Sequence, residues 1–389
     1  MVSLSAASAT ITTITIGALA DKLGKRRVFI SVGYILWGIS ILTFAFIRRD
    51  VIGSFIATAT AASAVAVTLV IALDCLMTFF GSSANDACFN AWLTDMTTED
   101  NRGKAEGINS MMPLVAILAV FGGFMGFDLG SASSWTAIFI IIGVAVTVIG
   151  IIGFFIIDEP QLDTAQSNAY FKNLAYGFRP SVIRENHRLY LLLGAFALFG
   201  IAIQIFMPYL ILYYTVALKM ADYVFIMAPA IILAAVFTVF FGRLYDKLKF
   251  RRSVLPTLAL LCLGFTLLFI FKSKALVFAG SLLMMCGYLA GSAVFGAAIR
   301  DLTPVNRTGA FQGLRILAQV LIPGVIGPAI GAAVLSTADT VVGDDGTVSF
   351  IPNENIFLAA LIAVLILGIA LMTAFCVSKK ISVTKIEED

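Results

Sequence analysis

The chain has few of the residues that enzymes use for catalysis and metal binding. Its 389 residues include one histidine and five cysteines, and only 13% of them are charged. One histidine cannot supply a catalytic triad or a cluster of metal ligands, and the cysteines lie in apolar segments without metal-ligand spacing. No glycine loop with the Lys and Ser/Thr of a phosphate-binding site is present. We therefore predict neither an enzyme nor an ATP-driven pump, and no cofactor or metal.

Two further absences narrow the class. The net charge of +3 is too small to favour a nucleic-acid partner. No basic segment precedes the first apolar stretch, so we predict no cleavable signal peptide. What the chain has in abundance is hydrophobic residues, which make up 60% of it. Apolar runs of about 18 residues or more recur along it, and each is long enough to cross a bilayer as a helix.

These runs predict an all-α membrane protein with eleven transmembrane helices. The predicted spans are roughly 3–20, 28–47, 64–92, 108–127, 135–157, 189–212, 222–241, 254–271, 276–299, 311–335 and 356–377. The first span is rich in Ser and Thr, so we expect it to face protein or a cavity more than lipid.

The placement of cations predicts the orientation, because cytoplasmic loops of membrane proteins are enriched in Lys and Arg. If the loop that follows the first span is placed inside, only five of the 26 Lys and Arg residues fall outside, namely Arg48, Arg49, Lys219, Lys272 and Lys274. We therefore predict a multi-pass protein of the cell membrane with a cytoplasmic C-terminus.

One loop pattern occurs twice. The first copy is Gly17-Ala18-Leu19-Ala20-Asp21-Lys22-Leu23-Gly24-Lys25-Arg26-Arg27, and the second is Gly242-Arg243-Leu244-Tyr245-Asp246-Lys247-Leu248-Lys249-Phe250-Arg251-Arg252. Gly, Asp, Lys and Arg-Arg keep the same spacing in both copies, and the clear departure is Lys249 in place of Gly24. A single copy could be a short turn whose cations only fix topology, but a repeat at matched positions indicates a repeated architecture.

This pattern resembles the signature loop of the major facilitator superfamily, which joins the second and third helices of each six-helix half in that family. The resemblance implies two pseudo-symmetric helical halves. Their predicted limits are 1–157 and 188–377, with a cytoplasmic linker at 158–187 and a cytoplasmic tail at 378–389. It covers nearly the whole chain.

A second repeated element fixes the register of the halves. Asp95-Met96-Thr97 followed by Gly107 matches Asp301-Leu302-Thr303 followed by Gly313. The signature loop follows two spans in the second half but only one in the first, so the first helix of the family is predicted to be missing. A mis-assigned start or a truncated product is our favoured explanation, ahead of a true eleven-helix protein.

Two acidic residues within the third span are candidates for ion coupling, because ionisable groups in hydrocarbon are costly and commonly functional. Asp86 shares a helix face with Asn90, so it could bind a proton or cation, or instead pair with a loop cation such as Arg102. Asp74 is the second candidate, unless it lies nearer the outer interface. Predicted solute ligands are Asn85, Asn90, Trp92, Gln204 and Gln319, and an interhelical hydrogen bond is the alternative for Gln204.

The repeated loops supply the predicted gating residues. They are Gly17, Asp21, Lys22, Arg26, Arg27, Asp95, Arg102, Asp246, Arg251, Asp301, Arg307 and Arg315. The resemblance implies that Asp21 docks against the tenth span, and pseudo-symmetry then places Asp246 against the fourth. We expect Arg315 near the cytoplasmic end of the tenth span, where its side chain could extend toward water.

Within the superfamily, the finer resemblance is to glycoside–pentoside–hexuronide:cation symporters and sucrose-type transporters. It rests on the acidic, carboxamide-bearing third span, the Asp-x-Thr loop and the Gln312-Gly313-Leu314-Arg315 start of the tenth span. It implies a monomer in the lipid bilayer that transports a sugar or glycoside with a proton or sodium ion. The alternatives are a drug/proton antiporter and a non-transporting sensor or truncated fragment.

Overall fold

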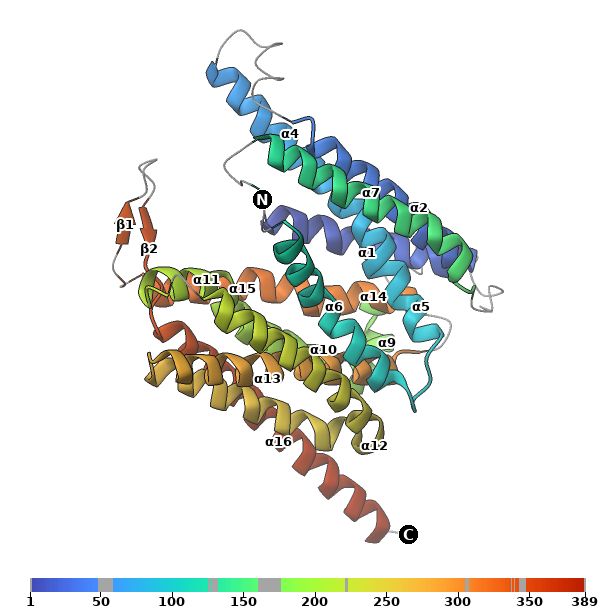
Figure 1. Cartoon of the computed structure of the whole chain (residues 1–389). Helices are drawn as coiled ribbons and strands as arrows, with labels where there is room; N and C mark the ends of the chain where they lie inside the picture. Colours follow the sequence, from blue (N-terminus) through green and yellow to red (C-terminus); the bar gives the residue numbers. More distant parts are fainter. Residues whose placement is uncertain are drawn as a thin grey trace. The chain divides into compact units, whose positions relative to one another are not determined.

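The computed structural model describes residues 2–47, 59–124, 127, 132–159, 176–220, 223–304, 308–336, 338, 340–342 and 348–387, and most of these are helical (Figure 1). The elements of the first half are α1 (Val2–Leu23), α2 (Arg27–Phe44), α4 (Ala59–Gly81), η1 (Ser82–Phe89), α5 (Asn90–Asp95), α6 (Arg102–Gly123) and α7 (Ala132–Ile156). A short 3₁₀ turn η2 (Tyr176–Phe178) and α9 (Pro180–Glu185) follow.

The second half contains longer helices. Its elements are α10 (His187–Phe206), η3 (Met207–Tyr209), α11 (Leu210–Leu212), η4 (Tyr213–Ala217), α12 (Val224–Ile270), α13 (Lys274–Leu302), α14 (Thr308–Ile316), η5 (Leu317–Leu321), α15 (Ile322–Leu335), β1 (Thr340–Val342), β2 (Val348–Phe350) and α16 (Asn355–Glu387). The segments η1, η4 and η5 are π-helical and each lies within a longer run of helix.

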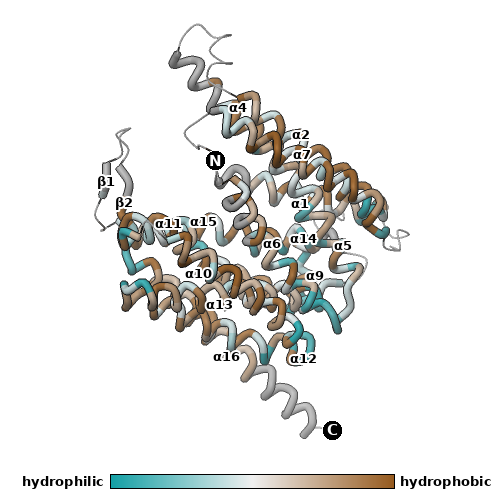
Figure 2. The backbone as a smooth tube through the Cα atoms, viewed as in Figure 1, coloured by the Kyte–Doolittle hydropathy of each residue, from teal (hydrophilic) through white to brown (hydrophobic). Residues whose placement is uncertain are grey.

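All eleven predicted spans coincide with helices. Eight helices in the described part of the chain are long and apolar enough to cross a membrane. Figure 2 shows the hydrophobic colour along much of α2, α7 and α13. The helices α1 and α6 are not among these eight, which agrees with the Ser- and Thr-rich composition of the first span.

A sharp bend divides α12 into two predicted spans. Its 47 residues would extend about 70 Å as one straight helix, more than twice the roughly 30 Å hydrocarbon core of a bilayer. The backbone leaves helical geometry at Lys249, with φ 58° and ψ 179°. Gly24, its counterpart in the first loop, has φ 63°. Both loops therefore turn through a positive φ, which glycine adopts easily and lysine does not.

The chain folds into two compact units, which do not follow the sequence halves. The first contains Met1–Met96, Ala119–His187 and Thr303–Leu317, and the second contains Thr97–Leu118, Arg188–Leu302 and Ala318–Asp389. Each unit thus includes a segment from the opposite half of the sequence. The predicted halves were defined by the sequence repeat, whereas these units are defined by their contacts. The units therefore do not test the limits of the halves, which stay a prediction.

Close helix pairs form the framework of each unit. In the first, α2 packs along α7, where a Cβ on Gly38 would lie 2.2 Å from Thr147 Oγ1. In the second, α12 packs along α13, where a Cβ on Gly264 would lie 2.5 Å from the Met284 nitrogen. Small residues allow this close approach of membrane helices, as Figure 1 shows for both pairs.

Two features of the second half were not expected from the sequence. Strands β1 and β2 form a short antiparallel hairpin in which Thr340 pairs with Phe350. Helix α16 continues to Glu387, so most of the predicted polar tail is helical. The prediction of a tail after residue 377 rested on polarity, which marks where a span leaves hydrocarbon but not where its helix ends.

We predict that Lys249→Gly stabilises the protein. A lysine at this φ and ψ stores strain of about 1–3 kcal/mol, which glycine would remove. The substitution also removes the exposed hydrogen bond from Lys249 Nζ to the Glu99 carbonyl. The melting temperature of the detergent-purified protein should rise. The matched variant Gly24→Lys should lower it, and a fall with Lys249→Gly would show that the bend is not strained.

Candidate functional site

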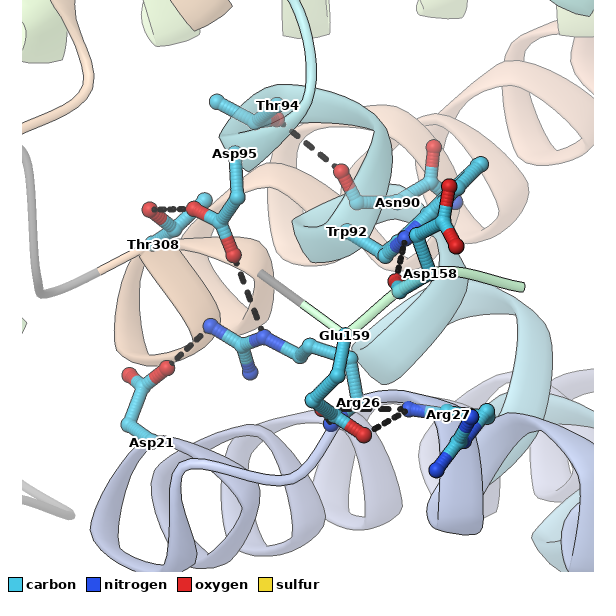
Figure 3. Close-up of polar contacts among 10 residues, drawn as sticks. All are labelled: Asp21, Arg26, Arg27, Asn90, Trp92, Thr94, Asp95, Asp158, Glu159 and Thr308. Atoms are coloured by element: carbon cyan, nitrogen blue, oxygen red, sulfur yellow. Dashed lines mark hydrogen bonds and ion pairs between the residues drawn. The ribbon is translucent and has the colours of Figure 1, made fainter. Parts of the chain in front are cut away.

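The first signature loop forms a buried ionic network around Arg26, whose side chain is 1% exposed. Its Nη2 donates to Asp21 Oδ1 at 2.6 Å, and its Nε donates to Asp95 Oδ2 at 3.2 Å (Figure 3). Burial alone would lower the pKa of the guanidinium, but the two carboxylates outweigh burial and raise it. A buried cation held by two carboxylates joins the end of α1 to the end of α5.

The same network reaches the first residue of α14. The Thr308 hydroxyl donates to Asp95 Oδ1 at 2.8 Å, as Figure 3 shows. Helix N-termini carry free N–H groups and partial positive charge, so a carboxylate is favoured beside them. We call Asp21, Arg26, Asp95 and Thr308 the first loop network. It links the first loop to the tenth span, the span that the resemblance pairs with Asp21.

Glu159, which sequence reasoning missed, holds the start of α2. Its carboxylate accepts hydrogen bonds from the backbone N–H groups of Arg26 and Arg27, the latter at 3.2 Å to Oε2. The preceding residue is held as well, because the Trp92 indole donates to the Asp158 carbonyl at 2.8 Å. Trp92 is thus engaged with the end of the fifth span, and the structure does not bring its indole to Asp86.

The second loop places a carboxylate on the N-terminus of α6. Asp246 Oδ1 accepts from the Gly103 N–H at 2.7 Å, and Oδ2 accepts from the Lys104 N–H at 3.1 Å. The helices touch here, since a Cβ on Gly103 would lie 2.4 Å from the Gly242 carbonyl oxygen. The fourth span is the one that pseudo-symmetry pairs with Asp246.

An ion pair adjoins this contact. Arg102 Nη1 lies 3.2 Å from Asp301 Oδ1, and the Tyr245 hydroxyl donates to Asp301 Oδ2 at 2.8 Å. We call Asp246, the first turn of α6, Arg102, Tyr245 and Asp301 the second loop network. Of the remaining gating candidates, Arg251 lies over the Phe375 ring at 5.5 Å.

The other candidates in the loops differ in how far they are buried. Arg307 lies outside the described residues. Gly17 is buried on α1, and the Lys22 and Arg27 side chains are exposed. Of the four cations in the first loop, only Arg26 is therefore buried.

Glu106 and Arg300 form a buried ion pair that sequence reasoning also missed. Arg300 Nε lies 2.6 Å from Glu106 Oε2, and the side chains are 1% and 3% exposed. Aligning the two copies of the repeat could have marked both residues, because each is charged where the other copy has a neutral residue. Aligning Asp95 and Gly107 with Asp301 and Gly313 sets Thr94 against Arg300 and Glu106 against Gln312. The two charged residues belong to different copies, yet they meet in the second unit.

The Asp86 carboxylate lies in a polar cluster on the π-helical segment η1. Asn85 Nδ2 donates to Asp86 Oδ1 at 3.1 Å, and Ser82 makes a side-chain hydrogen bond with the same carboxylate. The Tyr34 hydroxyl donates to Asn85 Oδ1 at 3.3 Å, and Asn90 Nδ2 donates to the Asn85 carbonyl at 3.0 Å. Short π-helical segments within α-helices are frequent at functional sites. Asp86 and Asn85 both keep part of their surface exposed.

Arg315 lies close enough to Asp86 for a favourable electrostatic interaction. The sequence suggested an Arg315 that extends toward water, but this side chain is 5% exposed, so that expectation was wrong. The cause is the packing of α14 against α1 and η1 within the first unit. The loop cation suggested as a partner for Asp86, Arg102, instead pairs with Asp301.

The other predicted residues belong to other elements. Asp74 is half-buried on α4. Gln204 and Gln319 belong to the second unit, where Gln204 lies against Gly327 of α15 and Gln319 is exposed on the π-helical segment η5. The structure therefore groups Asn85, Asp86, Asn90 and Arg315, and leaves the two glutamines in a separate unit.

Solved structures with the same fold include several transporters. The proton:xylose symporter XylE bound to 6-bromo-6-deoxy-D-glucose has a TM-score of 0.68 at 12% identity, covering 95% of this chain and 85% of that one. A bacterial homologue of the iron transporter ferroportin gives 0.68 at 13% identity, covering 95% and 88%. The transporter FucP in its outward conformation gives 0.62 at 14% identity, covering 94% and 89%.

At these identities the likeness establishes the fold alone. No curated protein sequence matches the chain. The family is shown by a sequence model of the Major Facilitator Superfamily, which matches residues 1–328. With two signature loops on a helical membrane fold, the chain belongs to the Major Facilitator Superfamily of transporters.

Proposed function

We propose that this membrane transporter moves a sugar or glycoside together with a proton or sodium ion. The observation that carries the proposal is the Asp86 carboxylate, which lies within a membrane helix among hydroxyl and carboxamide groups. A carboxylate in hydrocarbon is costly unless it is paired or functional. Asp86 is partly exposed, so an ion can reach it.

The coupling step follows from the charge on Arg315. An ion that binds Asp86 neutralises the carboxylate and weakens its attraction to Arg315. Asp86 and Arg315 come from different halves of the sequence, so ion binding changes a contact between the halves. A ligand shifts a conformational equilibrium only by its differential affinity for the two states. This contact supplies such a difference, and Asp74 remains a second predicted coupling residue.

The polar groups beside Asp86 suit a hydroxylated solute. Asn85, Asn90 and Tyr34 provide donors and acceptors of the kind that hold sugar hydroxyls. Similar folds belong to transporters of xylose and of iron, so the fold does not select the solute. The sugar assignment depends on these residues and on the resemblance of the third and tenth spans to glycoside symporters. Gln204 and Gln319 stay predicted ligands from the second unit.

We assign the gate to the two loop networks. Both join segments from opposite halves of the sequence on the side of the signature loops. Both networks are formed in the structure, and we propose that they form when the transporter is closed at the signature loops. Alternating access requires each side of a transporter to open in turn. Opening would therefore break the contacts of Asp95 with Thr308 and of Asp246 with α6.

Solute-driven ion movement in vesicles tests the proposed function. The purified protein would be reconstituted and exposed to a panel of sugars, glycosides and cationic drugs, with internal pH and internal sodium recorded. Ion uptake that follows one sugar supports the symporter. Ion release that follows a drug would favour an antiporter. If no compound in the panel changes internal pH or internal sodium, both assignments are contradicted.

We predict that Asp86→Asn abolishes solute accumulation against a gradient, because the amide cannot carry the coupling charge. Exchange of labelled solute at equal concentrations should continue, since the hydrogen-bonding groups remain. The control is Asp100→Asn, which removes an exposed carboxylate after the same span and should leave accumulation intact. Accumulation that survives Asp86→Asn would remove this residue from the coupling mechanism.

We predict that Glu106→Gln and Arg300→Gln each destabilise the protein, by about 3–5 kcal/mol, because each leaves an uncompensated buried charge. The double variant should recover much of the loss, which a cycle of thermal melts on the four proteins would measure. Glu99→Gln, at an exposed position, is the surface control. Strictly additive losses would mean that the two side chains do not interact.

A further inference from the structure

The second unit contains a cavity of about 690 Å³, which adjoins the second loop network through Tyr245 and Asp301 but includes none of the proposed solute ligands. It lies among α10, α12, α13 and α16, and its walls are mainly apolar side chains, among them Leu191, Leu198, Phe250, Leu367, Leu371 and Phe375. This volume is typical of sites that hold a small molecule or a lipid chain.

The polar lining of the cavity gathers on the side of the signature loops. Arg188 lies in the first turn of α10, Lys249 lies at the bend of α12, and Asp301 lies at the end of α13. From Arg188 the lining follows α10 for ten residues to Leu198, about 15 Å along a helix. The cavity is therefore elongated, with a polar mouth and an apolar interior.

In the described lining, the mouth has a net positive charge, because its one carboxylate is already paired with a cation. Asp301 is engaged by Arg102 and by Tyr245. Lys249 donates to the Glu99 carbonyl, which uses one of the three N–H groups of an ammonium. Arg188 is exposed, and no carboxylate in the described part of the chain pairs with it. Two cations can thus face a ligand at the mouth.

The backbone at Lys249 gives a second reason to assign a role to this mouth. The loop turns there through a positive φ, and the first copy of the loop meets that requirement with glycine. A lysine at the same position keeps a strained conformation, and strain of this kind is concentrated at functional sites. A cation bound to a ligand would explain why the second loop departs from the first at this residue.

Some residues that line the cavity are also exposed on the outer surface of the unit. Leu191 is 70% exposed and Leu198 is 40% exposed, although both line the cavity. In a multi-pass membrane protein, such leucines contact lipid. The ligand is therefore one that arrives from the bilayer, with an apolar part for the walls and an anionic part for the mouth.

We propose that this cavity binds an anionic phospholipid from the leaflet on the side of the signature loops. One acyl chain fills the apolar interior, and the headgroup phosphate contacts Arg188 and Lys249. The cation distribution predicts that this leaflet is cytoplasmic, where anionic lipids attract basic pockets between membrane helices. Its lining includes no residue of the Asp86 cluster, and the proposal does not depend on the identity of the solute.

Native mass spectrometry of the full-length protein tests the proposal. Phosphatidylglycerol, phosphatidylcholine with the same acyl chains, and inorganic phosphate would each be titrated into the detergent-purified protein. We expect tight binding of one phosphatidylglycerol only. Since one cation beside an anionic lipid contributes about fivefold to affinity, Arg188→Gln with Lys249→Gln should weaken binding about thirtyfold. The matched control, Arg184→Gln with Lys247→Gln, removes two exposed cations outside the lining and should bind as the parent protein does.

Gly194→Leu tests the acyl-chain part separately. Gly194 lines the cavity, and a Cβ there would meet no atom within 4 Å. The leucine should fill the interior, abolish phosphatidylglycerol binding and leave the melting temperature undiminished. Equal binding of phosphatidylcholine, binding of inorganic phosphate at the same site, or unchanged binding by Gly194→Leu would each overturn the proposal.

Discussion

The constraint on which the rest of the structure depends is the need to satisfy helix N-termini where membrane helices meet. The first N–H groups of a helix have no partner within it. Asp246 satisfies two of them at the start of α6, whereas Asp95 accepts from the side-chain hydroxyl of Thr308, the first residue of α14. Both acceptors are carboxylates, which also suit the positive end of the helix dipole. The repeated loops are thus fixed by the helices that they contact.

The two loop networks are related by the repeat, but the residues beside them differ in charge. The second unit contains the buried pair of Glu106 and Arg300, while the equivalent residues, Gln312 and Thr94, are neutral. Breaking a buried ion pair is far more costly than separating neutral groups. The asymmetry also extends to the bend, where Lys249 replaces Gly24. The two contacts therefore need not open with equal ease, although the sequence repeats their central motif.

Much of this could be predicted from the sequence, because the relevant signals are local. Apolar length predicted the helices, and the resemblance of the repeated loops to a family signature implied which spans Asp21 and Asp246 adjoin. The role of Glu159 could not be predicted, since it contacts a loop about 130 residues earlier and nothing in its own neighbourhood marks it. Arg315 was placed wrongly because polarity suggested water, whereas packing of α14 against α1 and η1 buries it. The hairpin of β1 and β2 lies between spans, where hydropathy carries no signal.

The central claim is that the loop carboxylates hold the starts of the facing helices, and amide hydrogen exchange at Gly103 and Lys104 tests it most directly. Their N–H groups donate to Asp246, so they should exchange slowly in the parent protein. In Asp246→Asn the weaker acceptor should make the peptide that contains them exchange faster, while a peptide from α13 remains protected. Unchanged exchange at Gly103 and Lys104 in that variant would show that Asp246 does not hold α6, and the account of the gate would be wrong.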